Sequence, residues 1–194
     1  METGEQKTTA LERIERIATG AAAADGVVSI FKAVLATAPF TGGITSLISD
    51  YIPTARQRRI EDFAEQVAND LKRLESKVNQ EYLRTDDFAF MLEKCFRGAA
   101  EHPQEEKLKA FRAILVNSAV RNDVAEEEKE YFLNLVNSLS VLHIRILRFL
   151  AAPQQYLEDM GIPMNKLQGG FTDMFRTAMP DIHHQVIKSA FGDL

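Results

Sequence analysis

Residues 59–78, RIEDFAEQVANDLKRLESKV, carry the pattern that decides the fold class of this chain. Apolar residues recur along the stretch at alternating steps of four and three positions. They are Ile60, Ala64, Val67, Leu71, Leu74 and Val78. This spacing puts them on one side of an α-helix, and a seam of that kind packs along other helices at a shallow angle. The stretch therefore predicts a long helix over residues 55–79 whose seam is buried against further helices.

The segments that follow this helix also carry helix-start signals. Thr85 is a good N-cap and precedes a run of apolar residues at helical spacing. Asp123 with Glu126 resembles a capping box, and Ser140 predicts the start of a helix that Pro153 ends. The apolar residues of the helix after Glu126 are Tyr131, Phe132, Leu135, Val136 and Leu139.

These patterns predict an all-α chain, because no stretch alternates as a β-strand does. We expect a flexible tail at residues 1–8 and a multi-helix bundle of about six helices over residues 9–152. After Pro153 short helical pieces are separated by Gly and Pro, so residues 153–194 are expected to form a small helical appendage.

Composition narrows the class of protein. The chain has 194 residues, a net charge of −5 and a hydrophobic content of 45%, which together favour a globular protein over a general nucleic-acid binder. Cys95 is the only cysteine, so neither an internal disulfide nor a cysteine-rich zinc site is possible. No secretory signal and no run of about 20 apolar residues is present. We therefore expect a cytoplasmic protein.

Several short motifs resemble bacterial all-helical proteins to which no activity is assigned. The residues that carry this likeness are 39–43 (PFTGG), Arg59 with Phe63, Glu106-Lys107 ahead of Phe111, and 139–147 (LSVLHIRIL). The likeness spans roughly residues 27–153.

The tail resembles the three-helix part of a winged helix-turn-helix that lacks the wing. A DNA reader usually carries several basic residues on its recognition helix. Residues 153–194 instead contain three basic and five acidic residues, and the last helical piece offers only Lys188. We therefore expect the tail to contact protein.

The first candidate site is the apolar segment 27–52, which is read as a helical hairpin around a Pro/Gly turn. Its large apolar residues are Leu35, Phe40, Ile44 and Ile48. Burial inside the bundle is the favoured interpretation, because apolar stretches this short usually belong to a core. The alternative is a membrane-active hairpin, since the segment stands beside a basic cluster that would suit anionic lipid.

That basic cluster, Arg56, Arg58 and Arg59, is a candidate contact for an anion or a membrane surface. Cations are unfavourable in the first turn of a helix unless something offsets them. Nearby acidic residues on the same helix are the favoured offset, and a bound anion is the alternative.

A third candidate is a ribonuclease pair. Some all-helical ribonucleases of the HEPN group use an Arg and a His separated by four to six residues, with the His as acid or base. Arg97 with His102 fits that spacing, and so does Arg176 with His183. Chance produces such pairs in a chain of this composition. No metal site, cofactor motif or small-molecule site is predicted.

The sequence thus favours a non-catalytic helical interaction module whose partner is another protein or a second copy. The alternatives are a membrane-active helical effector that uses residues 27–52 and a HEPN-like ribonuclease. Nucleic acid is not an expected partner of the module.

Overall fold

The computed structural model describes residues 29–31, 33–34, 54–121 and 124–194. Every regular element within these residues is a helix, and no strand occurs among them. The all-α fold class expected from the sequence is therefore confirmed. The chain divides into two compact units, residues 1–137 (unit 1) and residues 138–194 (unit 2), and each is described by itself.

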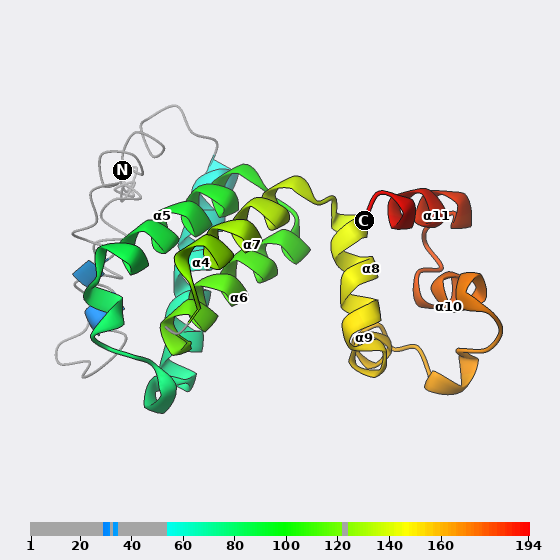
Figure 1. The fold of residues 1–194 in the computed structure, drawn as a ribbon, viewed down its shortest axis with the longest axis horizontal. Helices are drawn as coiled ribbons and strands as arrows, with labels where there is room; N and C mark the ends of the chain where they lie inside the picture. Colours follow the sequence, from blue (N-terminus) through cyan, green and yellow to red (C-terminus); the bar gives the residue numbers. More distant parts are fainter. Residues whose placement is uncertain (1–28, 32, 35–53, 122–123) are drawn as a thin grey trace, which may run out of the picture. The chain divides into compact units, whose positions relative to one another are not determined.

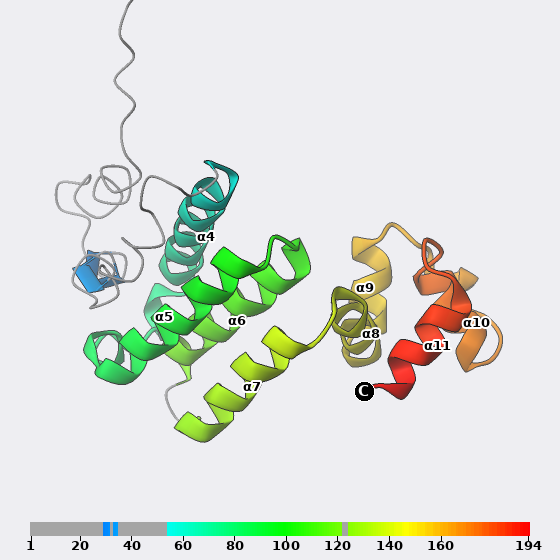
Figure 2. The same ribbon diagram turned by 90° about the horizontal axis from the view of Figure 1, so that it is seen from above.

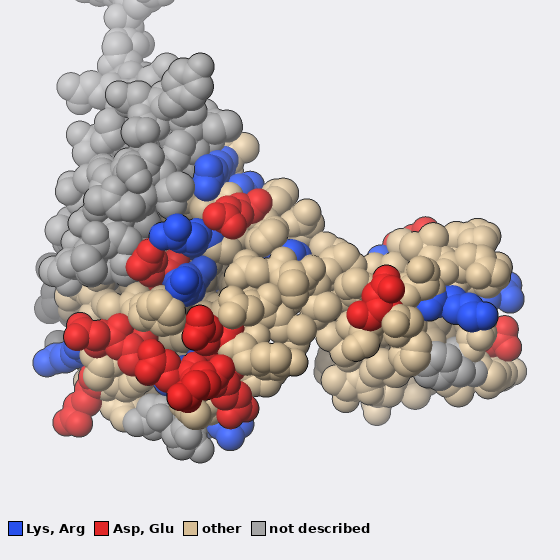
Figure 3. Space-filling view, turned by 45° about the horizontal axis from the view of Figure 1, so that its top comes forward, with Lys and Arg blue, Asp and Glu red and all other residues tan. Residues whose placement is uncertain are grey.

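The described part of unit 1 is built on long helices. They are α4 (Thr54–Arg73), α5 (Asp86–Glu101), α6 (Glu105–Val120) and α7 (Glu126–Ser138). Helix α4 packs on both α5 and α6, which form a hairpin of helices. Helices α5, α6 and α7 run side by side (Figures 1 and 2). Charged side chains of both signs cover much of the outside of this unit on the face drawn in Figure 3.

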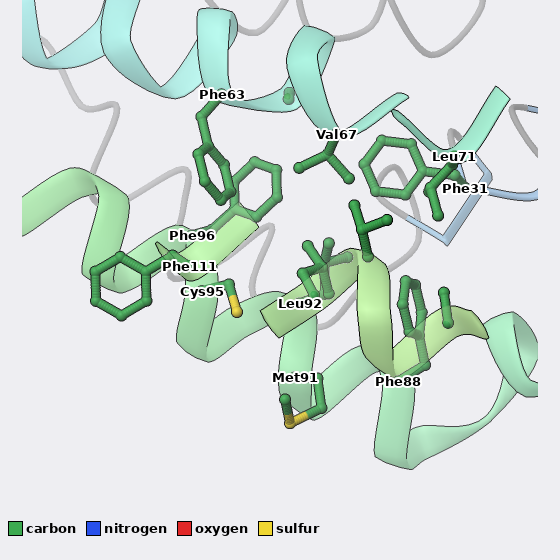
Figure 4. Close-up of a cluster of buried hydrophobic side chains, with 14 of the residues drawn as sticks. Phe31, Phe63, Val67, Leu71, Phe88, Met91, Leu92, Cys95, Phe96 and Phe111 are labelled. Atoms are coloured by element: carbon green, nitrogen blue, oxygen red, sulfur yellow. The ribbon is translucent and has the colours of Figure 1, made fainter. Parts of the chain in front are cut away.

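The seam of α4 is buried, as its spacing predicts. Ile60 is 2% exposed, and Val67 and Leu71 are fully buried. Figure 4 shows Phe63, Val67 and Leu71 of α4 directed toward α5, where Leu92 fills the space below them. Burial of apolar side chains of this size is the main favourable term in holding such helices together.

Helix α4 ends earlier than the residues 55–79 expected from the sequence. It stops at Arg73, and a 3₁₀ turn, Glu75–Lys77, follows. Leu74 is consequently only partly buried, although it still packs against the core. The turn directs Val78 back into the same core, so the apolar seam continues beyond the end of the α-helix.

Helix α5 begins at the predicted N-cap. The Thr85 hydroxyl accepts a hydrogen bond from the Phe88 backbone N–H at 3.2 Å, which satisfies one of the free donors of the first turn. The expected stripe is buried: it comprises Phe88, Met91, Leu92, Cys95, Phe96 and Ala99. The sequence prediction for this helix is therefore confirmed.

Gly98 allows helices α5 and α6 to approach each other closely. The ring of Phe111 from α6 sits directly over it, so that a Cβ atom at position 98 would lie 2.4 Å from Phe111 Cζ. Only a residue without a side chain fits at that position, and the fully buried Phe111 fills the space instead.

A short helical piece before α4 also reaches this core. Phe31 is fully buried in the core of unit 1, and Ile30 and Val34 pack against the same core. Of segment 27–52, this is the part that the structure describes.

Unit 2 is a separate small helical domain. Its elements are α8 (Val141–Ala151), α9 (Pro153–Asp159), a 3₁₀ turn (Met164–Lys166), α10 (Phe171–Ala178) and α11 (His184–Gly192). Its core comprises Ile146, Phe149, Tyr156, Leu157, Phe175, Ala178, Met179, Ile187 and Ala190.

The division between the units lies before α8, between residues 137 and 138, whereas the change in composition placed it at residues 152–153. Helix α8 carries Ile146 and Phe149, whose side chains complete the core of unit 2. Pro153, expected to end α8, also occupies the first turn of α9, where its missing N–H costs nothing.

Hydrogen bonds and an ion pair also stabilise unit 2. Ser140 caps α8 as predicted, since its hydroxyl accepts from the His143 N–H at 3.2 Å. Arg145 of α8 donates to both carboxylate oxygens of Asp181, at 2.8 and 2.9 Å, and lies 3.3 Å from the Tyr156 hydroxyl. The guanidinium lowers the pKa of Asp181.

Candidate functional site

Helix α7 turns a different face inward from the one its apolar residues suggest. Tyr131 and Phe132, two of the large apolar residues of this helix, are 62% and 45% exposed. The buried residues of α7 are Lys129 and Leu133. Both aromatic side chains therefore lie on the outward side of α7.

Lys129 is buried because its ammonium group finds partners inside the unit. Its Nζ donates to Asp87 Oδ2 at 2.6 Å and to the Tyr82 hydroxyl at 3.0 Å. It also lies 4.7 Å from the centroid of the Tyr82 ring, within the range of a cation–π contact. The Tyr82 hydroxyl in turn donates to Asp87 Oδ2 at 2.8 Å. This triad ties α7 to the start of α5.

The triad shifts the titration of two of its members. Burial raises the pKa of Tyr82, although the hydrogen bond from Lys129 acts in the opposite direction. Burial alone would lower the pKa of Lys129, but its hydrogen bonds to Asp87 and Tyr82 outweigh that effect and raise it. Both groups therefore stay protonated through neutral pH.

A second lysine holds the other end of α7. Lys107 of α6 is buried and its Nζ donates to the Asn137 carbonyl at 2.9 Å. That carbonyl lies in the last turn of α7, where a cation also interacts favourably with the helix dipole. Burial lowers the pKa of Lys107. Helix α7 is thus fastened by a lysine near each end and by Leu133 between them.

A groove runs between α6 and α7, and we call it the α6–α7 groove. Its volume is about 440 Å³. It is lined by Ala113, Ile114, Asn117, Ser118 and Arg121 of α6 and its C-cap, by Val124, and by Glu128, Lys129 and Phe132 of α7. Phe132 forms an exposed apolar edge of the groove, and Tyr131 packs edge-on against it with ring centroids 5.8 Å apart.

Helix α7 carries four exposed acidic residues, which are Glu126, Glu127, Glu128 and Glu130. Of these, Glu128 lines the α6–α7 groove, whereas Glu130 lines a groove between α5 and α7. On the face drawn in Figure 3, acidic side chains gather in one part of unit 1. Two basic residues also line the α6–α7 groove: Lys129, which pairs with Asp87, and Arg121.

One residue of the arginine cluster at the start of α4, Arg59, forms hydrogen bonds within unit 1. Arg59 Nε donates to the Ala99 carbonyl at 2.9 Å, and Arg59 Nη2 donates to the Ala100 carbonyl at 2.8 Å. These carbonyls end α5, so Arg59 caps that helix. Arg58 is exposed, and Arg56 Nε is buried without a hydrogen-bond partner among the described residues.

The residues proposed for a membrane hairpin lie outside the described part of the chain. They are Leu35, Phe40, Ile44 and Ile48. Within the part that the structure does describe, no helix combines the length and the apolar character needed to cross a bilayer.

The two residues of the first ribonuclease pair have different partners. Arg97 Nη2 donates to Glu93 Oε1 at 2.6 Å on the surface of α5. The His102 ring stacks on Phe111 with centroids 6.0 Å apart. Arg97 lines a groove of about 110 Å³ between α5 and α7, and His102 is not among its lining residues.

The second Arg–His pair does line one groove, in unit 2. This open groove of about 730 Å³ is bounded by Arg176 and His183 together with Asp173, Asp181 and His184. His183 Nδ1 accepts from the Gln185 N–H at 3.4 Å and caps α11, so one ring nitrogen is engaged. Arg176 lies 3.7 Å from Asp173, which weakens its field toward a phosphate.

Nucleophilic and metal chemistry find little support among the described residues. Burial raises the pKa of the Cys95 thiol strongly, and this thiol has no access to solvent. Across residues 54–121 and 124–194 no group of three or more His, Cys, Asp or Glu is placed to hold a metal ion. No sequence pattern predicts that lysine side chains hold α7, because a buried lysine cannot be told from an exposed one until its partners are known.

Comparison of the chain with protein-family models, with curated proteins and with solved structures gives no match.

Proposed function

We propose that this chain is a non-catalytic protein-interaction module and that the outward side of α7 is its contact surface. The observation that carries the proposal is the exposure of the adjacent rings of Tyr131 and Phe132 on α7, with Phe132 at the edge of the α6–α7 groove. Neither ring contributes to the buried core of unit 1.

Exposed aromatic pairs of this kind suit protein contacts. Tyr and other aromatic residues are enriched at the centres of protein interfaces, where they contribute much of the binding energy. Leaving them in water has a cost in solubility that a partner removes. On this reading the buried side of α7 maintains the fold, and its outward side is available to a second protein or to a second copy of this chain.

The same proposal covers the finer organisation of the chain. Unit 1 is taken as a helical bundle, and unit 2 as a winged-helix-like appendage without a wing. Helix α11 then takes the place of the recognition helix, and Lys188 is its only basic side chain. That charge supports a protein contact over a DNA contact.

The alternatives have less support from the described residues. The hypothesis of a membrane-active hairpin depends on residues 35–52, which lie outside the described part of the chain. The neighbouring Phe31 packs in the core of unit 1. The ribonuclease reading would need an Arg and a His to converge on a phosphate. The pair that shares a groove, Arg176 and His183, shares it with Asp173 and Asp181. The cytoplasmic location stays a prediction.

Site-specific photocrosslinking tests the proposal. The photoreactive residue p-benzoylphenylalanine replaces Tyr131 or Phe132, one at a time, in the cells that make the protein. We expect a discrete crosslinked product from each of these positions. The matched control is Met164 of unit 2, which is similarly exposed at 48% and is expected to give none. The absence of a product at both α7 positions would contradict the proposal.

A further inference from the structure

We propose that unit 2 is a pH-sensitive module whose helices α8 and α11 loosen when its histidines take up protons in mildly acidic solution. The inference is independent of the proposed function. It rests on the positions of the four histidines of the chain. Three of them lie at helix N-termini in unit 2, and the fourth lies at a helix C-terminus in unit 1.

The N-terminus of α8 is held by a histidine that accepts a hydrogen bond. His143 Nδ1 accepts from the Ser140 backbone N–H at 3.2 Å, and the Ser140 hydroxyl accepts from the His143 N–H, also at 3.2 Å. This is a capping box in which an imidazole takes the place of the usual Glu or Gln side chain. Only a neutral ring can accept this bond, because both nitrogens of a protonated ring are donors.

The N-terminus of α11 depends on a histidine in the same way. His183 is its N-cap, and the ring Nδ1 accepts from the Gln185 N–H at 3.4 Å. His184, the first residue of the helix, stands beside it, with ring centroids 4.6 Å apart. Protonation of His183 therefore removes the acceptor, and protonation of both rings adds repulsion between like charges.

Protonation also places positive charge where both helices oppose it. The free N–H groups of a first turn carry partial positive charge, so a cation there destabilises the helix. Histidine is the side chain that ordinarily changes charge between about pH 5 and pH 8, whereas carboxylates titrate below that range. The caps of α8 and α11 are therefore complete in neutral solution and are lost as pH falls through the range in which histidine titrates.

The two carboxylates that share a groove with His183 and His184 are already engaged. Asp181 accepts two hydrogen bonds from Arg145, and Asp173 lies 3.7 Å from Arg176. Arg176 lines the same groove and adds a positive charge to it. These carboxylates are therefore poorly placed to offset further charge on the two rings.

Other charged groups stand on the helices that pack with α8 and α11. They are Arg148 of α8, Glu158 and Asp159 of α9, and Lys188 and Asp193 of α11 and its C-cap. Asp159 pairs with Arg148, and Glu158 accepts a hydrogen bond from Gln154. Asp193 lies at the opposite end of α11 from His183.

Unit 1 provides an internal comparison. Its histidine, His102, is the C-cap of α5 and lies at the end of that helix where the dipole favours a positive charge. The ring stacks on Phe111, with centroids 6.0 Å apart. Acidification through the same range should therefore leave α5 and α6 intact.

Backbone amide hydrogen exchange of the full chain, followed by NMR at about pH 7.5 and about pH 5.5, tests the inference. Each rate is compared with that of an unstructured chain at the same pH, so that only protection is measured. We expect the protection of the amides of α8 and α11 to fall about fivefold or more at the lower pH, because each helix loses a cap. The protection of α5 and α6 should stay constant.

Matched variants assign the effect to the caps. In His143→Gln the side chain is a usual capping-box acceptor but does not titrate, and in His183→Asn it is a good N-cap. The double variant should be folded at neutral pH and lose less than about twofold of its protection on acidification. His102→Gln in unit 1 should keep the full response of the wild type. In the wild type, the titration of the His143 and His183 ring protons should coincide with the loss of protection in the helix that each ring caps.

Each contrary result would overturn the inference. Unchanged or greater protection of α8 and α11 at the lower pH would mean that a carboxylate such as Asp193 stabilises the charged rings. An equal fall in α5 and α6 would indicate a general effect of acid. A fall of wild-type size in the double variant would separate the response from the caps. If that variant does not fold, a loss of protection in the wild type that does not coincide with the ring titrations would have the same consequence.

Discussion

Helices α4, α5 and α6 are held together differently from α7, although all lie in unit 1. The first three share an apolar core in which Leu71, Leu92 and Phe111 are fully buried. Helix α7 adds Leu133 to that core, packs the partly buried Val136 against it, and is also held by the ammonium groups of Lys129 and Lys107. The three core helices bury large apolar side chains, whereas α7 leaves two aromatic side chains exposed. This difference indicates which part of unit 1 maintains stability and which part is free to bind.

Leu71→Ala should have the largest effect, because it leaves a cavity in the shared core. We expect the free energy of unfolding of unit 1 to fall by about 2–4 kcal/mol. Urea denaturation followed by circular dichroism measures it. An effect near zero in soluble protein would show that α4 does not form the centre of this core.

Gly98→Ala should come next, since its Cβ would meet the ring of the buried Phe111. We expect a loss of about 1–3 kcal/mol, the usual cost of overpacking a core. The matched control is Gly192→Ala in α11, where a Cβ would meet nothing within 4 Å. That change should be neutral or slightly stabilising, because Ala favours a helix more than Gly does. Equal effects at the two positions would contradict the close approach of α5 and α6.

Lys129→Met keeps much of the side-chain volume but removes the ammonium group that ties α7 to Asp87. We expect a loss of about 1–2 kcal/mol, because the partly buried Asp87 carboxylate loses its cation and keeps only the hydrogen bond from the Tyr82 hydroxyl. Lys109→Met is the control, since that lysine is exposed and pairs with Glu105 at the surface. It should change stability by less than about 0.5 kcal/mol. A comparable loss from both variants would remove the distinction between a fastening lysine and a surface one.

The triad also predicts a loss of stability at high pH. The pKa of Tyr82 is raised above 10.0 and that of Lys129 above 10.5, so the folded state holds both protons more strongly than the unfolded state. This contribution is complete below about pH 10 and is lost as pH rises through the folded pKa values. Lys107, whose pKa is lowered, acts in the opposite direction. Melting temperatures between pH 8 and pH 11 should therefore fall less steeply for Lys129→Met than for the wild type. Parallel curves would contradict the triad.

The smallest effects on stability should come from the exposed aromatic residues. Tyr131→Ser and Phe132→Ser should each change the free energy of unfolding by no more than about 0.5 kcal/mol. The same urea titration measures them. A loss as large as that of Leu71→Ala would mean that these rings support the fold and do not await a partner.

How far the sequence could predict this arrangement differs between the two regions. Regular spacing identified the buried stripe of α5 and the seam of α4, because burial of one helical face imposes that period. Composition suggested that α8 belonged with the helices before it, yet Ile146 and Phe149 complete a different core.

The inward face of α7 could not be predicted from the sequence, for a physical reason. Its inward face is chosen by Lys129 meeting Asp87 and Tyr82, which lie more than forty residues earlier in the chain. The spacing of apolar residues describes only the local sequence. It contains no information about a charged partner that lies far away in the chain. The α6–α7 groove was unpredictable for the same reason, since it exists only where α7 meets α6.

Hydrogen exchange of individual backbone amides in unit 1 tests the central contrast most directly. Helix opening that breaks few apolar contacts costs less free energy. We therefore predict that the amides of α7 exchange with a lower opening free energy than those of α5 and α6. Equal protection of the amides of α7 and α5 would contradict the account.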